Sequence, residues 1–342
     1  MLLREPALIE PVGAARPSAS RAPFLTAGNP RPVLCAARDS DADAVLALVL
    51  ETEGSTYAHA GAMAYFDARR QVGWLSGGCL EPALAQEAAQ VAAAGVLAWL
   101  EIDTRGDEDL LSGSALGCRG RLRLALLPLQ TLVGLGRVID AWLDRGEDID
   151  FALGATGEVR ISAGAASVRT RLPTQTMPWP TPCSSWSWSL PRLPSALLLG
   201  AGPESLSLLR LLHDLGWRTT LVERRPRWRN PDAPVDRRVE ETPATLIDSA
   251  GADVALVMHH HFELDREALE VLAHTPIPFI GLLGPQRRRD DLFKLLTPEQ
   301  RASIAPRLRS PVGMPLGGQG PEAIALSIAA QLQAWRASFA PQ

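Results

Sequence analysis

One strand–turn–helix–strand pattern constrains the fold of this chain more than any other feature of its sequence. The apolar run Ala196–Leu199 ends in a glycine-rich turn at 200–202, leucines then recur at helical spacing, and Thr219–Val222 is a second apolar run. A glycine-rich turn in this context belongs to a βαβ unit with parallel strands. Apolar runs at Val254–Met258 and Ile277–Ile280 continue the alternation. The pattern therefore predicts an α/β fold with a doubly wound parallel sheet.

The N-terminal half of the chain follows a different pattern. Val45–Leu50 is a continuous apolar run, Arg121–Pro128 alternates with period two, and helical spacing is found at Pro82–Ala94 and Leu132–Asp144. Strands and helices do not alternate regularly here, so an α+β domain is predicted. Two further short strands are expected, at Ala62–Phe66 and Val72–Leu75.

Length and composition divide the chain into domains. Its 342 residues exceed the roughly 250–300 at which a single hydrophobic core usually stops growing. Residues 1–40 are rich in proline, alanine and arginine and are expected to form a loosely ordered tail. Residues 172–193 combine several prolines with three tryptophans and are expected to form a linker. The predicted domains are therefore 41–171, of α+β type, and 194–342, with the parallel sheet.

Charge and composition exclude several classes of function. The net charge is −4 and acidic and basic residues are interspersed, so no basic surface is expected to attract nucleic acid or a membrane. No apolar run reaches the roughly 18 residues of a membrane helix, and the first residues lack the pattern of a signal peptide. The four cysteines are widely spaced, without a CxxC pair, as is typical of reduced thiols. We expect a cytoplasmic protein.

Two cysteines lie in glycine-rich turns of the N-terminal half. The turn Gly77-Gly78-Cys79 precedes a predicted helix, whose dipole favours the thiolate form of the cysteine. Gly117-Cys118 lies in a second such turn, and residues 51–56 form a third loop at the end of a strand. Because thiolates are soft ligands and turn amides bind anions, the loops indicate a site for an anionic ligand with a soft centre. The alternative is that each cysteine packs as a small apolar residue.

The glycine-rich turn of the C-terminal half is a second candidate site. Gly200 permits the tight turn, and Gly202 allows a phosphate to approach the amides of the following helix. Glu223 ends the next strand, where an acid binds the ribose of a dinucleotide. However, Ser205 replaces the third glycine of the motif, so a scaffold with an empty crevice is the alternative. An NAD(P)-dependent oxidoreductase with a reactive cysteine is one functional hypothesis.

Three consecutive histidines, His259-His260-His261, follow the third apolar run of this half. The carboxyl ends of such strands face the crevice of the sheet. Consecutive strand residues point to alternate faces, so at most two of these histidines could bind one metal ion. A metal-dependent hydrolase and a single hydrogen-bonding histidine therefore remain as alternatives. Arg287–Arg289, at the start of a predicted helix, are either an anion-contacting edge or a solvated face.

Longer motifs in both halves resemble the XdhC/CoxI family of xanthine dehydrogenase accessory factors. They are ETEGSTYAHAGAMAYFD, GWLSGGCLEPAL and LGCRGRL in the first half, and LLLGAGPES, VMHHHFELDREAL, FIGLLGPQRRR and RSPVGMPLGGQGPEAIALSIAAQL in the second. The resemblance covers about residues 44–335. It implies an XdhC/CoxI-type domain followed by a Rossmann-like domain.

The resemblance further implies a chaperone that does not itself turn over a metabolite. Members of the family are regarded as binding the sulfurated molybdenum cofactor, a molybdopterin dithiolene with a phosphate, and inserting it into a molybdenum hydroxylase of the xanthine dehydrogenase class. A homodimer and a cysteine desulfurase as a second partner are implied in the same way. Cys79 and Cys118 become the cofactor contacts, and His260 and Asp265 match the histidine and the acid of a family motif. The glycines that shape the cofactor loops are Gly77, Gly78 and Gly117.

Overall fold

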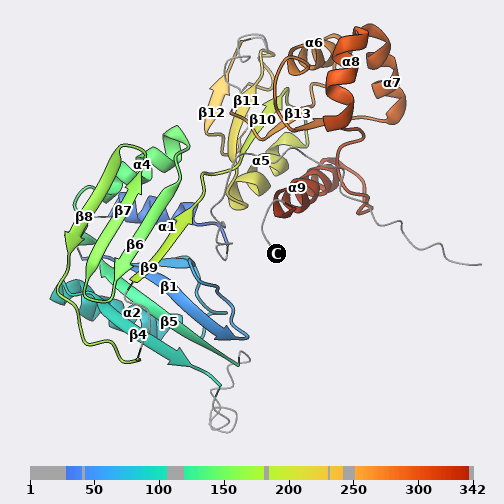
Figure 1. The fold of residues 1–342 in the computed structure, drawn as a ribbon. Coiled ribbons are helices and arrows are strands. Elements are labelled where there is room, and N and C mark those ends of the chain that lie inside the picture. Colours follow the sequence, from blue (N-terminus) through green and yellow to red (C-terminus); the bar gives the residue numbers. More distant parts are fainter. Residues whose placement is uncertain are drawn as a thin grey trace, which may run out of the picture.

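The computed structural model describes residues 28–40, 43–105, 119–180, 185–229, 232–241 and 251–338. The expected order of an α+β domain followed by a Rossmann-like parallel-sheet domain is confirmed, and the two lie side by side in Figure 1. Among the described residues, no helix has the length and apolarity to cross a membrane.

Within its described residues, the N-terminal domain contains two antiparallel sheets. The five-stranded sheet has the order β3-β2-β1-β5-β4, and the four-stranded sheet has the order β8-β7-β6-β9. The strands are β1 (Val45–Gly54), β2 (Met63–Phe66), β3 (Gln71–Val72), β4 (Ala98–Asp103), β5 (Gly120–Pro128), β6 (Ile149–Gly154), β7 (Glu158–Ala163), β8 (Ala166–Arg171) and β9 (Ser185–Leu190). The helices are α1 (Arg31–Arg38), α2 (Glu81–Ala94) and α4 (Leu135–Arg145), with a 3-10 turn at Leu129–Thr131.

The apolar run of β1 is buried on both faces of the sheet, which explains why it shows no alternation. Residues 45, 47 and 49 pack in a cluster with α2, while residues 46, 48 and 50 pack in a cluster with α1, α4 and the four-stranded sheet. The second half of the strand, from residue 51 onward, leaves this core and becomes polar. The loop expected at 51–56 is therefore mostly strand, because β1 continues to Gly54 and pairs residues 51–54 with β5.

The structure corrects three expectations about the ends and connections of this domain. Residues 172–193 are not simply a linker, because β9 pairs with β6 and buries Trp186 and Trp188 on one face. The expected tail contains α1, whose apolar residues pack in the core; residues 1–27 lie outside the described residues. The strand expected at Val72–Leu75 ends at Val72, because the chain turns at Gly73 with φ +88°.

In the described part of the C-terminal domain, six parallel strands form a sheet in the order β12-β11-β10-β13-β14-β15. Strand order reverses between β10 and β13, which is the switch point where ligands of such sheets bind. The strands are β10 (Ser195–Leu199), β11 (Arg218–Val222), β12 (Arg237–Val239), β13 (Val254–Val257), β14 (Phe279–Leu282) and β15 (Leu308–Arg309). The helices are α5 (Ser205–Asp214), α6 (Phe262–Leu272), α7 (Gln286–Leu295), α8 (Pro298–Ile304) and α9 (Pro321–Ala337), with a 3-10 turn at Ala305–Arg307.

Helices cover both faces of this sheet, as a doubly wound fold requires. Helices α5 and α9 pack together in a cluster that includes Leu212 and Ile328, and α6, α7 and α8 contribute Leu269 and Leu292 to the opposite cluster. Both layers are visible in Figure 1 around the sheet. The cores of the two domains are thus built from separate sets of residues.

Polar contacts join the two domains near α1. The guanidinium of Arg31 pairs with Asp236, and Asn29 Nδ2 donates to the backbone oxygen of His213 at 3.1 Å. Where the chain enters the second domain, Arg192 Nη1 and Nη2 donate to Asp253 at 2.9 and 2.6 Å. The start of the N-terminal domain, at α1, and the segment that follows its last strand therefore both contact the C-terminal domain.

Candidate functional site

The chain segments just after β1 and β4 and just before β5 meet at one end of the five-stranded sheet. Ser55 N donates to the backbone oxygen of Arg119 at 3.1 Å, and Gly120 N donates to Thr104 Oγ1 at 3.2 Å. A Cβ on Gly54 would lie 2.5 Å from the same oxygen of Arg119, so only glycine allows this approach. Between these loops and the turn at 76–80 lies a hollow of about 20 Å³.

A buried carboxylate fixes the turn at 76–80. Glu81, the first residue of α2, is 3% exposed, and its Oε1 accepts hydrogen bonds from the amides of Leu75 at 3.0 Å and Ser76 at 2.8 Å. The Ser76 hydroxyl donates to Oε2 and accepts from the amides of Gly78 and Leu80, both at 3.1 Å. Burial raises the pKa of Glu81, but the hydrogen bonds from Ser76 and the amides lower it further, so the net pKa is below its usual range. The turn is therefore built around a carboxylate anion.

The thiol of Cys79 is presented by this turn. Cys79 is exposed and directly precedes Leu80, the N-cap residue of α2, so the structure places it at the helix N-terminus that the sequence indicates. Gly78 has φ +102°, and a Cβ on Gly77 would meet no atom within 4 Å, so open space lies beside the backbone of the turn at Gly77. Two large apolar side chains near this turn are also exposed, Tyr57 at 56% and Trp74 at 59%. The predicted residues Gly117 and Cys118 lie outside the described residues.

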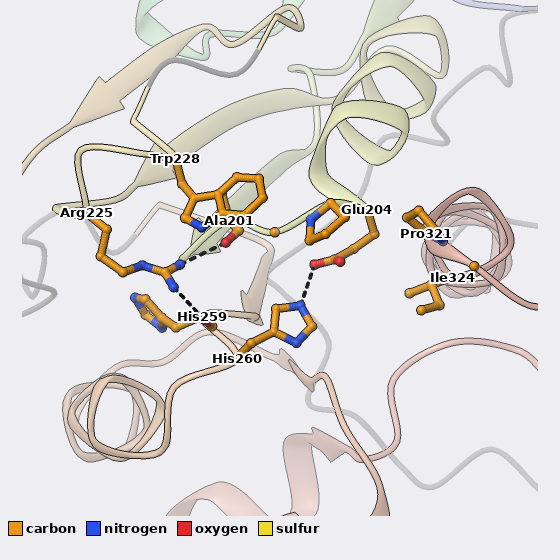
Figure 2. A pocket seen from close by; sticks show the side chains of 11 residues that line it. Ala201, Glu204, Arg225, Trp228, His259, His260, Pro321 and Ile324 are labelled. Atoms are coloured by element: carbon orange, nitrogen blue, oxygen red, sulfur yellow. Dashed lines mark hydrogen bonds and ion pairs between the residues drawn. The ribbon is translucent and has the colours of Figure 1, made fainter.

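A larger pocket, of about 370 Å³, lies at the switch point of the C-terminal domain (Figure 2). Residues 201–204 of the glycine-rich turn form one wall, and Arg225 and Trp228 follow β11. His259 and His260 follow β13, and residues 320–324 at the start of α9 complete the lining. The structure thus brings Gly202 and His260 together in one site, separate from the domain that carries Cys79.

The glycines of this turn make room for the protein's own side chains. Gly200 has φ +92°, and a Cβ on it would lie 2.5 Å from Cγ of His259. A Cβ on Gly202 would lie 2.7 Å from Oε1 of Glu204 and 2.8 Å from Nε2 of His260. The space beside the Cα of Gly202 is therefore occupied by Glu204 and His260.

The backbone amides of the turn also have partners within the protein. Ala201 N donates to Glu223 Oε2 at 2.9 Å, and Gly202 N donates to Ser205 Oγ at 2.9 Å. Glu223 is buried and points into the turn, where Arg225 Nε donates to its Oε1 at 2.9 Å. Burial raises the pKa of Glu223, but the hydrogen bonds from Arg225 and the amides outweigh this effect and hold the pKa low. Glu223 thus stabilises the turn with the same oxygens that a ribose would need.

The first two histidines of the run have different partners. His259 is buried, and its Nδ1 lies 3.1 Å from Asp265 Oδ1, while Arg288 Nη2 donates to Asp265 Oδ2 at 2.7 Å. His260 has φ +55°, and its Nε2 lies 3.0 Å from Glu204 Oε1. The hydrogen bond to Glu204 raises the pKa of His260. Among the described residues, no group of three histidine, cysteine or acidic side chains could hold a metal ion.

Several residues that shape these sites were not anticipated from the sequence. The role of Glu81 could have been predicted from the sequence, because an acid in the first turn of a helix, beside a cysteine turn, is well placed to accept hydrogen bonds from backbone amides. Glu204 belongs to the glycine-rich motif, but nothing in the sequence indicates that it contacts His260. Trp228 and Ile324 enter the pocket from segments that the sequence does not connect to it.

The fold and the two sites define a two-domain protein in which an exposed cysteine turn precedes a Rossmann-like domain. Two family models match this chain: the XdhC and CoxI family over residues 37–103, and the XdhC Rossmann domain over residues 197–332. The chain therefore belongs to the XdhC and CoxI family and is an XdhC-type accessory protein.

Two relatives extend the similarity over nearly the whole chain. A probable xanthine dehydrogenase subunit of Bacillus subtilis (strain 168) is 25% identical over 325 residues, which is 89% of this chain and 97% of that protein. The crystal structure of a xanthine dehydrogenase from Bacillus halodurans matches with a TM-score of 0.75 and 28% identity, covering 91% of this chain and 96% of that one.

Proposed function

We propose that this protein is a chaperone that binds the molybdenum cofactor at the cysteine turn of its N-terminal domain and inserts it into a molybdenum hydroxylase of the xanthine dehydrogenase class. The observation that carries the proposal is the exposed thiol of Cys79, presented by a turn that is hydrogen-bonded to the buried Glu81. Family membership and the names of both relatives support the link to xanthine dehydrogenase.

The residues around Cys79 fit such a ligand. A thiolate is a soft donor suited to molybdenum, and the open space over Gly77 admits a ligand to the backbone of the turn. When bound, the cofactor would supply the molybdenum centre that the client enzyme needs. Gly77 and Gly78 would shape the approach to the thiol, and Cys118, which precedes β5 in the sequence, would be the second thiol contact. Tyr57 and Trp74 would offer apolar surface beside the cofactor.

Molybdenum and pterin analysis of the purified protein tests the proposal. Wild-type protein from cells that make the cofactor should retain it on gel filtration, and Cys79→Ser should retain at least about tenfold less. Cys35→Ser is the matched control, because Cys35 is the other free cysteine of the described residues and lies on α1, where it packs against a different core cluster from Leu80 of the turn. Equal cofactor content in Cys79→Ser and wild type would refute the role of this thiol.

The client is tested separately by transfer. The loaded chaperone should restore activity to an apo molybdenum hydroxylase encoded near its gene, without turning over a metabolite itself. We also propose a homodimer and a cysteine desulfurase as a sulfur-donating partner, both consistent with handling of a sulfurated cofactor. A chaperone that binds the cofactor but activates no such hydroxylase would contradict the proposed client.

A further inference from the structure

The pocket of the C-terminal domain offers a second binding site. We propose that it binds a planar heterocycle with adjacent N–H donors, the amino-oxo-pyrimidine edge that guanine and pterins share, and that Glu204 is the acceptor. The lining comes only from the C-terminal domain, so the proposal does not rest on the function proposed for Cys79.

Glu204 is a buried carboxylate with unused acceptor capacity. Its side chain is 3% exposed, and within the described part of the chain the single side chain that hydrogen-bonds it is His260, through Oε1. A carboxylate has about four acceptor positions, and buried polar groups are normally satisfied. Because Glu204 lines the pocket, the remaining positions can be filled by the N–H groups of a ligand.

His260 fixes the direction of this carboxylate. Its backbone has φ +55°, a conformation that side-chain-bearing residues seldom adopt and that often marks a functional site. The hydrogen bond from Nε2 holds Oε1 in place, and the imidazole is half-exposed at the pocket. The pair therefore presents a positioned acceptor beside a group that can itself hydrogen-bond a ligand.

The remaining walls suit a flat ring. Trp228 and Ile324 lie on either side of the Glu204–His260 pair in Figure 2, and Pro203 and Pro321 add apolar surface. Aromatic ligands stack favourably on an indole. A volume of about 370 Å³ is near the lower end of the roughly 300–1,000 Å³ of small-molecule pockets, which suits one ring system better than a dinucleotide.

The hydrogen bonds of the turn and the carboxylate of Glu204 disfavour a phosphate at the same place. The amides of Ala201 and Gly202 already donate to Glu223 and Ser205, so the turn does not direct them at a ligand. The carboxylate of Glu204 also stands at the N-terminus of α5, where a phosphate would otherwise be attracted. The heterocycle would therefore enter ring first, with any phosphate pointing outward.

Isothermal titration of the full-length protein distinguishes the ligands. Guanosine or unsubstituted pterin should bind, and comparison of the two shows which source of the shared edge is preferred. Adenosine, which stacks equally well but lacks the donor pair, should bind at least about tenfold more weakly, because a hydrogen bond to a charged group is lost. Binding of NAD⁺ in preference to guanosine and pterin would overturn the proposal.

Variants test the role of each wall. Glu204→Gln should weaken guanosine or pterin binding at least about tenfold, and Trp228→Ala should weaken all the ring ligands alike. Glu267→Gln is the control, because that glutamate pairs with Arg224 outside the pocket. Cys79→Ser should leave this binding unchanged, so failure here is distinct from failure of the chaperone proposal. If Glu204→Gln does not fold, equal affinity of wild-type protein for guanosine and adenosine still refutes the inference.

Discussion

Single glutamates organise both candidate sites. Glu81 and Glu223 each come from an element that follows the turn they stabilise, and each accepts hydrogen bonds from backbone amides of that turn. A buried carboxylate is favourable only when such donors surround it. In the cysteine turn the result is a fixed thiol, whereas in the glycine-rich turn the amides are no longer directed at a ligand. The same residue type thus supports one site and limits the chemistry of the other.

Replacement of Glu81 should destabilise the cysteine turn. Glu81→Gln retains the shape but weakens charge-assisted hydrogen bonds, so we expect a loss of about 1–3 kcal/mol in the free energy of unfolding at pH 7. Urea denaturation measures this loss. Glu87→Gln is the control, since Glu87 lies exposed on the same helix.

The stabilisation that Glu81 provides should also depend on pH. The pKa of Glu81 is depressed in the folded protein, so its stabilisation is present above about pH 4.3, the ordinary pKa of an unfolded glutamate, and is lost as the pH falls through the folded pKa. The difference in unfolding free energy between wild type and Glu81→Gln should therefore shrink as the pH falls below about 4.3, the pKa of an ordinary glutamate. A constant difference between pH 7 and pH 3.5 would contradict this account.

At the scale of elements, local sequence patterns were sufficient to predict most strands and helices but not how these elements pack against one another. The apolar runs of β1 and β10 and the end of α4 at Gly146 were readable, because burial and glycine caps act locally. Strand β9 was missed because the surrounding prolines outweighed the alternation of Trp186 and Trp188. The sequence placed candidate loops at strand ends, but the contact of Ser55 with Arg119 depends on the register of β1 against β5. Similarly, nothing local indicates that Glu204 meets His260.

The junction of β1 and β5 gives a test at this scale. These strands pair Gly54 with Gly120 at their ends, and Gly54 has φ +74° with no room for a Cβ beside Arg119. Gly54→Ala should therefore lower the free energy of unfolding by more than about 1 kcal/mol, through both backbone strain and the clash. Gly251→Ala is a suitable control, because a Cβ there meets no atom within 4 Å and φ is not positive. Equal urea midpoints for the two variants would show that the loops do not need this close approach.

For the whole molecule, the polar contacts near α1 determine how firmly the two domains are held together. Interfaces between domains of one chain are commonly polar and permit relative motion. Arg31 and Asp236 are both largely buried, with 16% and 18% of their side chains exposed, so this pair is shielded from solvent more than a surface ion pair. Burial raises the pKa of Asp236, but the hydrogen bond from Arg31 and the amide of Thr219 lower it more, and the net pKa is depressed. The ion pair therefore persists at neutral pH.

A double-mutant cycle on Arg31→Ala and Asp236→Asn measures the contribution of this contact. Each single variant should weaken the coupling between the domains, and the double variant should cost less than the sum, with an interaction energy of about 0.5–3 kcal/mol. Calorimetry should show the unfolding of the two domains separating into distinct transitions in the variants, and limited proteolysis should cut the segment around residue 193 faster. The control pair is Arg171 with Glu158, which are 69% and 52% exposed within one domain and should show coupling near zero. If the Arg31 cycle were also additive and the calorimetric profile unchanged, the domains would be held by other contacts, with Arg192 and Asp253 the next pair to test.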